Sequence, residues 1–109
     1  MAVVYTYTMD RSKLPVNSPK VNESGRALFA QMVQEGKIIG FFSEITEEHQ
    51  IDSILYKDAE AREEHKTLFA QIPNTWVDPN GQTPDDFNPC ISSELREATE
   101  DDIDIMLFP

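Results

Sequence analysis

Several residue types that mark particular protein classes are scarce in this chain of 109 residues. The single cysteine, Cys90, excludes an internal disulfide, and no HxxxH or CxxC spacing is present to hold a structural metal. No run of about 18 apolar residues could span a bilayer. At the start of the chain the basic residues follow the apolar ones, which is the reverse of a secretory signal. These absences predict a soluble, cytoplasmic protein that holds no metal and needs no cofactor.

Basic residues are also few. Nine Lys and Arg stand against twenty Asp and Glu, which gives a formal net charge of −11. Such a surface repels phosphate backbones and anionic lipids, so neither nucleic acid nor membrane is expected as a partner. A mimic of DNA would also be acidic, but a solvated acidic surface that aids solubility is the commoner reason for this charge.

Two segments show the four, three, four spacing of an amphipathic helix. The first, residues 19–35, has Ser18 before it as a cap and begins with Pro19, which suits the first helical position. Gly36 follows it and suits a left-handed helix end. The second, residues 58–71, begins with Asp58 as its N-cap. The apolar stripes consist of Val21, Gly25, Leu28 and Met32 in the first helix and of Ala61, His65, Leu68 and Ile72 in the second.

Four segments have the alternation and the β-branched or aromatic content of strands. They are residues 3–9, 37–46, 50–57 and 91–98. The order strand, helix, strand, strand, helix, strand is the split βαβ pattern. We therefore predict an α+β class protein with a ferredoxin-like βαββαβ domain and an antiparallel sheet over residues 1–98.

Two further segments fall outside this repeat. Residues 74–90 hold three prolines, three asparagines and a glycine, and a loop of this length in a small domain is typically functional or a lid. Trp76 within it could cover a cavity, anchor a partner or plug its own domain. Residues 99–109 join acids to five apolar side chains, so this acidic-apolar tail is expected to dock on its own subunit or on a partner.

The second strand is apolar on both alternating sides. Ile39, Phe41 and Ile45 would occupy one side, and Ile38 and Phe42 the other. Because both helices of a ferredoxin-like domain cover the same face of the sheet, the opposite face would need another cover. We therefore predict a homodimer whose two sheets pack face to face.

Three stretches carry a resemblance to a known family: "GKIIGFFSEI", "ILYKD" and "AEAREEHKTLFAQI". They resemble the corresponding parts of the antibiotic biosynthesis monooxygenase type of dimeric α/β barrel, over about residues 20–72. That superfamily includes monooxygenases that form quinols without a cofactor, haem-degrading enzymes and members with no established reaction. The resemblance implies a dimeric barrel with a cavity between sheet and helices, toward which a histidine of the second helix points.

This resemblance makes His65 the candidate catalytic residue. Its imidazole could deprotonate a phenolic substrate, whose carbanion form then reacts with oxygen. Tyr56 at the end of a strand, with Tyr5 or Tyr7 on the adjacent one, could orient a small aromatic ligand. In the haem-degrading branch His65 would instead ligate iron, but the first strand offers only threonines where those enzymes carry an asparagine.

Two hypotheses therefore stay open. The chain is either a non-catalytic accessory or interaction protein in which His65 packs and forms hydrogen bonds, or a monooxygenase-like oxidoreductase acting on an aromatic or quinol-like molecule. A histidine on the apolar side of a helix is more often a packing residue, which favours the first hypothesis. A pocket beside His65 that admits a ring would favour the second.

Overall fold

A computed structural model describes residues 1–13, 23–71 and 90–109. They form an α+β structure built on one four-stranded antiparallel sheet with strand order β2-β3-β1-β4. The strands are β1 (Val3–Asp10), β2 (Ile38–Ile45), β3 (His49–Tyr56) and β4 (Cys90–Glu97). The helices are α1 (Glu23–Gln34), α2 (Ala59–Ala70) and α3 (Glu100–Met106), with a single 3-10 turn, η1, at Arg11–Lys13.

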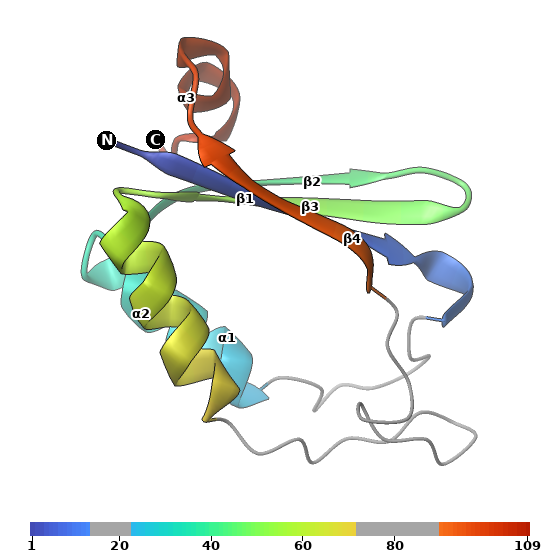
Figure 1. Ribbon diagram of the computed structural model, residues 1–109, viewed down its shortest axis with the longest axis horizontal. Coiled ribbons are helices and arrows are strands. Elements are labelled where there is room, and N and C mark those ends of the chain that lie inside the picture. Colours follow the sequence, from blue (N-terminus) through green and yellow to red (C-terminus); the bar gives the residue numbers. More distant parts are fainter. Residues whose placement is uncertain (14–22, 72–89) are drawn as a thin grey trace.

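This arrangement confirms the predicted α+β class with an antiparallel sheet, and the order of strands and helices is compatible with a ferredoxin-like fold. Figure 1 shows α1 and α2 together on one face of the sheet and α3 on the opposite face. No helix in the described ranges is long and apolar enough to cross a membrane. The predicted helix start at Ser18 and Pro19, the side chain of Trp76 and all but the end of the 74–90 loop lie outside the described residues.

The ends of the first two helices follow from their sequence. Lys37 and Gly36 donate backbone hydrogen bonds to the carbonyls of Met32 and Val33, which closes α1 with Gly36 in the left-handed region at φ 74°. At the start of α2 the Asp58 carboxylate accepts a hydrogen bond from the Ala61 amide at 2.8 Å. The predicted left-handed glycine and the predicted N-cap are both confirmed.

The face of the sheet beneath α1 and α2, here called the inner face, holds the larger part of the core. Its buried members come from three strands and both helices: Val3, Met32, Ile38, Ile54, Tyr56 and Ala61. Aromatic side chains, among them Tyr5, Phe29 and Phe41, pack around this cluster. Burial of these apolar stripes against one sheet face is what holds α1 and α2 in place.

The opposite face, here called the outer face, has its own small cluster of Val4, Leu55 and Met106. Met106 belongs to α3, so the C-terminal segment of the chain packs on its own sheet. Thr99 caps α3 by accepting a hydrogen bond from the Asp102 amide, and the Asp102 carboxylate accepts one from the Thr99 amide. Arg96 on β4 forms a bidentate ion pair with the Asp102 carboxylate. The tail, residues 99–109, therefore contains a helix that was not predicted from the sequence.

The expected side assignment within β2 is wrong. A β-bulge between Ile38 and Gly40 shifts the register against β3. As a result Ile38 and Phe41 both join the inner cluster, whereas Ile39 packs with the outer one. A single extra residue thus divides the apolar side chains of β2 in a way that strict alternation does not predict.

Candidate functional site

His65 and Tyr56 form a directly bonded pair on the inner face. Tyr56 is the last residue of β3, and His65 lies two turns into α2, so the chain reverses between them and brings the side chains together. The Tyr56 hydroxyl and His65 Nδ1 are 2.6 Å apart, a short hydrogen bond in which either atom can donate. Tyr56 is 1% exposed and His65 8% exposed. Both candidate residues are therefore buried against each other.

Burial sets the protonation of this pair. Desolvation, with a smaller contribution from the Arg62 charge, lowers the pKa of His65 below its usual value. Burial also raises the pKa of Tyr56 to about 12, although the Arg62 charge acts in the opposite direction. Neutral imidazole and neutral phenol are therefore the favoured forms at neutral pH. A neutral imidazole is the form that a general base needs, and it is also the form that a packed histidine takes.

The remaining surroundings of His65 are aromatic. Its ring lies between Phe29 of α1 and Phe69 of α2, with centroid distances of 6.4 Å and 6.3 Å and steep interplanar angles of 67° and 72°. Its Nδ1 is already engaged by Tyr56. This environment holds the imidazole in one orientation and shields it, as expected of a histidine that packs.

Arg62 links the pair to a second tyrosine. Its guanidinium carbon lies 4.1 Å from the ring centroid of Tyr5 and 5.9 Å from that of Tyr56. These are cation–π distances, and the cation favours the neutral imidazole by electrostatic repulsion of its charged form. Arg62 was not singled out in the sequence, although it lies one turn before His65 and therefore near the same side of the helix.

A second polar group lies further along the inner face. The buried carboxylate of Asp52 accepts hydrogen bonds from Ser43 Oγ at 2.7 Å and from Gln50 Nε2 at 3.2 Å. Tyr7 is paired with Asp52 in the β1–β3 ladder, so its phenol lies near the carboxylate. Burial first, and then the Asp52 charge and hydrogen bond, raise the pKa of Tyr7. An acid in the apolar strand "QIDSILYK" was the signal that sequence reasoning missed.

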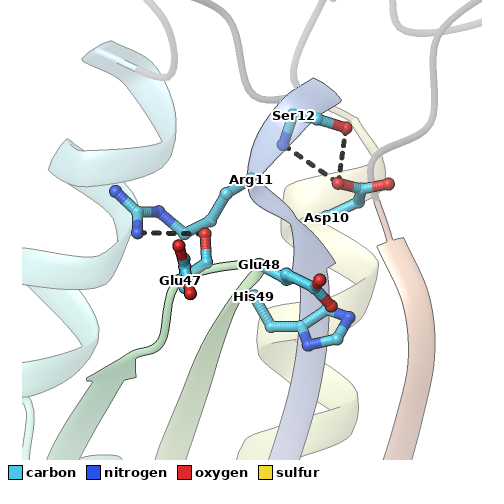
Figure 2. Close-up of a pocket in the computed structure, with 6 residues that line it drawn as sticks. All are labelled: Asp10, Arg11, Ser12, Glu47, Glu48 and His49. Atoms are coloured by element: carbon cyan, nitrogen blue, oxygen red, sulfur yellow. Dashed lines mark hydrogen bonds between the residues drawn. The ribbon is translucent and has the colours of Figure 1, made fainter.

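A surface hollow of about 590 Å³ lies at the β2–β3 turn, and neither Tyr56 nor His65 is among the residues that line it. Asp10, Arg11, Ser12, Glu47, Glu48 and His49 line it (Figure 2). The Arg11 guanidinium donates to the Thr46 carbonyl at 2.6 Å, and Asp10 Oδ1 accepts from the Ser12 amide and hydroxyl. The hydrogen bonds within this hollow fasten the end of β1 to the turn.

The structure thus brings together two of the residues named from the sequence, His65 and Tyr56, and joins Tyr5 to them through Arg62. Tyr7 belongs to the separate Asp52 group, although its ring centroid is 5.7 Å from that of Tyr5. Trp76 lies outside the described residues. Within the described part of the chain, no group of three or more His, Cys, Asp or Glu side chains could hold a metal ion.

Comparison with known proteins adds no relative. No family model, no curated protein and no solved structure matches the chain. The resemblance to the antibiotic biosynthesis monooxygenase type therefore stays a prediction.

Proposed function

We propose that this chain is a non-catalytic accessory or interaction protein, cytoplasmic and free of cofactors, that works as a homodimer and docks a further protein through its C-terminal segment. The observation that carries the proposal is a group of exposed apolar side chains on α3 and the residues after it. We call this group, Ile103, Ile105, Leu107 and Phe108, the C-terminal surface. Apolar side chains gathered on a segment that is itself anchored to the sheet are typical of a contact site.

The charge around the C-terminal surface indicates the kind of partner. Glu100, Asp101 and Asp104 are exposed on α3, between and beside the apolar residues. A protein segment that offers apolar side chains with Lys or Arg around them would match both features. Nucleic acid would be repelled by the same carboxylates.

The pairing of His65 with Tyr56 supports the non-catalytic part of the proposal. The imidazole is buried and its Nδ1 is engaged, and the hollow described at the β2–β3 turn does not include it. Each of these features has a structural explanation that needs no substrate. A packing histidine joins α2 to β3 by a hydrogen bond that an apolar residue could not make.

The experiment compares two equal substitutions at equally exposed isoleucines. Ile105→Glu changes the C-terminal surface, and Ile45→Glu changes the end of β2; the two side chains are 63% and 62% exposed. Both variants and the wild type would be immobilised and incubated with extract from the native cell, and the captured proteins identified. A protein held by the wild type and by Ile45→Glu but lost with Ile105→Glu supports the proposal. Equal capture by all three contradicts it.

A point substitution is preferable to removal of residues 99–109. Met106 covers Val4 and Leu55, so truncation would expose the outer cluster and confuse lost binding with lost stability. Ile105 points to solvent, and its replacement leaves the buried contacts of α3 intact.

The second candidate is a cofactor-independent monooxygenase-like oxidoreductase acting on an aromatic or quinol-like molecule. The bond between Tyr56 and His65 favours it, because it orients a neutral imidazole whose lowered pKa keeps it in the form of a base. Oxygen uptake with a panel of quinols tests it on wild type and His65→Ala, with circular dichroism as the check on folding. Uptake that requires His65 would establish this activity, and equal rates would exclude His65 as its base.

A further inference from the structure

The two edges of the sheet differ in how their backbone groups are covered. On the β2 edge the end of the chain turns back: Leu107 forms a bridge with Gly40, and the Phe108 amide donates to the Ile39 carbonyl at 3.0 Å. On the β4 edge, no described segment pairs with the strand between Ser93 and Glu97 on the side away from β1. Figure 1 shows β4 as the last strand of the sheet, with α3 standing above its end.

β4 lacks two of the residue types that commonly protect an edge strand from pairing. It is eight residues long and contains neither lysine nor proline. Its side chains from Ile91 to Glu97 are all exposed, and Leu95 is 48% exposed although it shares the inner face with Tyr5. The stretch from Ser93 to Glu97 therefore offers backbone donors and acceptors to another strand.

The sequence of β4 complements itself in one antiparallel register. A two-fold axis perpendicular to the sheet keeps every residue on its own face, and residues that oppose each other in a ladder share a face. The axis must therefore pass between the two copies of one residue, which then lie opposite each other. With the axis at Leu95, Glu94 lies opposite the partner's Arg96 and Leu95 opposite the partner's Leu95. An axis at Glu94 or at Arg96 would place like charges directly opposite each other, which destabilises a strand pair.

One competing register, with the axis at Ser93, places no like charges opposite each other, but it requires Ile91 to pair in the ladder. β4 is irregular at that point: Thr8 pairs with Ser92 and Met9 with Cys90, so Ile91 is the extra residue of a bulge. A bulged residue disturbs the regular pairing that this register would need.

We propose that two copies of this chain join through β4, antiparallel and with the two-fold axis at Leu95, to form one continuous eight-stranded sheet. The inference rests on the homodimer of the proposed function and assigns its surface. The outer face, which the sequence suggested for the dimer, is partly occupied by α3. Arg96 already binds Asp102 through both terminal nitrogens, but a guanidinium carries five N–H donors, so the partner's Glu94 can share it.

Disulfide trapping tests the register directly. In a Cys90→Ser background, Leu95→Cys would place two thiols at the axis, where opposed Cα atoms are about 4.5–5.5 Å apart, within disulfide range. Ser93→Cys, on the same strand and face, would lie opposite the partner's Glu97. Its thiol would be about 14 Å along the strand from its counterpart, which is beyond that range. With oxidised glutathione as oxidant, we expect covalent dimer from Leu95→Cys at least about tenfold faster than from Ser93→Cys.

Either of two results would overturn this register. If Ser93→Cys cross-links faster, the axis lies at Ser93. If neither position cross-links in a protein that sedimentation shows to be dimeric, the dimer uses another surface.

A charge reversal tests the same contact without cysteine. Glu94→Arg places arginines opposite the partner's Arg96 at two symmetric positions, so we expect the dissociation constant of the dimer to rise about tenfold or more. Glu63→Arg, an equal change at an exposed position of α2, should leave it unchanged. Sedimentation equilibrium at about 0.15 M salt, where general repulsion between acidic copies is screened, measures both. Equal constants for the two variants would contradict the β4 contact.

The outcomes separate this inference from the function it rests on. If the wild type stays monomeric at every concentration, both the proposed homodimer and the proposed β4 contact are contradicted. If the protein dimerises and Glu94→Arg leaves the dissociation constant unchanged, only the β4 contact is contradicted. Capture of a partner through Ile105 is measured independently of either result.

Discussion

The two faces of the sheet are covered in opposite ways. On the inner face two helices of twelve residues each lie over an aromatic core that contains buried polar groups, His65 and Asp52. On the outer face a helix of seven residues covers an apolar cluster at one end of the sheet. Two amphipathic helices with apolar stripes cover the inner face, whereas the cover of the outer face depends on the close approach at Gly40 and on the Thr99 cap. Substitutions on the two faces should therefore differ in size and in kind.

The same substitution made on each face gives the largest contrast. Met32→Ala opens a cavity beneath α1, in the center of the inner core, and should lower the free energy of unfolding by about 3 kcal/mol. Met106→Ala should cost less, about 1–2 kcal/mol, because α3 has seven residues and Met106 is its buried side chain, so this short helix can shift to fill the space. Urea denaturation followed by circular dichroism measures both. Equal losses would mean that α3 is held as rigidly as α1.

Gly40 provides the next test, because its missing side chain lets the tail approach β2. A Cβ at this position would overlap the Met106 carbonyl, a backbone group that cannot rotate away. We expect Gly40→Ala to cost about 2 kcal/mol, as overpacking does, and to displace α3 while α1 and α2 stay in place. Hydrogen exchange should then show faster exchange at the Leu107 and Phe108 amides.

The control for Gly40 is Gly36→Ala. Gly36 needs its left-handed conformation but has open space around its Cα, so this change should destabilise the end of α1 without freeing the tail. Tail exchange that is equally fast in both variants would contradict a specific role of Gly40.

The same difference between the faces explains what the sequence could predict. The spacing of Leu28 and Met32, the N-cap at Asp58 and the left-handed Gly36 are local signals, and the structure bears each of them out. The bulge at Ile38–Gly40 lies where β2 pairs with β3 and where Gly40 bridges to Leu107, and no single window of sequence contains these contacts. α3 was missed because a helix of seven residues is too short to show a repeating apolar stripe, although Thr99 and Asp102 have the spacing of a capping box.

The candidate site likewise contains residues that the sequence identified and residues that it did not. His65 was expected to face the sheet because it lies on the stripe of α2, and Tyr56 ends the neighbouring strand. Arg62 and Asp52 were not named from the sequence, because charged residues are usually exposed. Their positions follow from cross-strand and helix–sheet contacts, such as Tyr7 opposite Asp52 and Arg62 over Tyr5.

A smaller effect should come from the polar pair of the inner face. Tyr56→Phe removes the hydroxyl bonded to His65 and leaves a buried ring nitrogen without that partner, at a cost of about 1–2 kcal/mol. Tyr5→Phe is the matched control, because it keeps the ring beneath Arg62. Urea denaturation of both variants at pH 7.5 should give the larger loss for Tyr56→Phe. A larger loss for Tyr5→Phe would show that the Tyr56–His65 bond contributes little.

The smallest effect should be a pH dependence that belongs to the inner face alone. Because burial lowers the pKa of His65, the unfolded chain binds a proton near pH 6.5 that the folded chain does not, so stability is full above this pH and falls as the pH drops below it. Tyr56 forms a hydrogen bond with the imidazole, and burial raises the pKa of Tyr56 to about 12, so the phenol stays neutral between pH 7.5 and 5.5. His65→Gln should flatten the dependence of stability on pH. Met106→Ala should lower stability at every pH but leave this dependence unchanged. A slope that survives His65→Gln would have to come from another group, and His49→Gln would then test the remaining histidine.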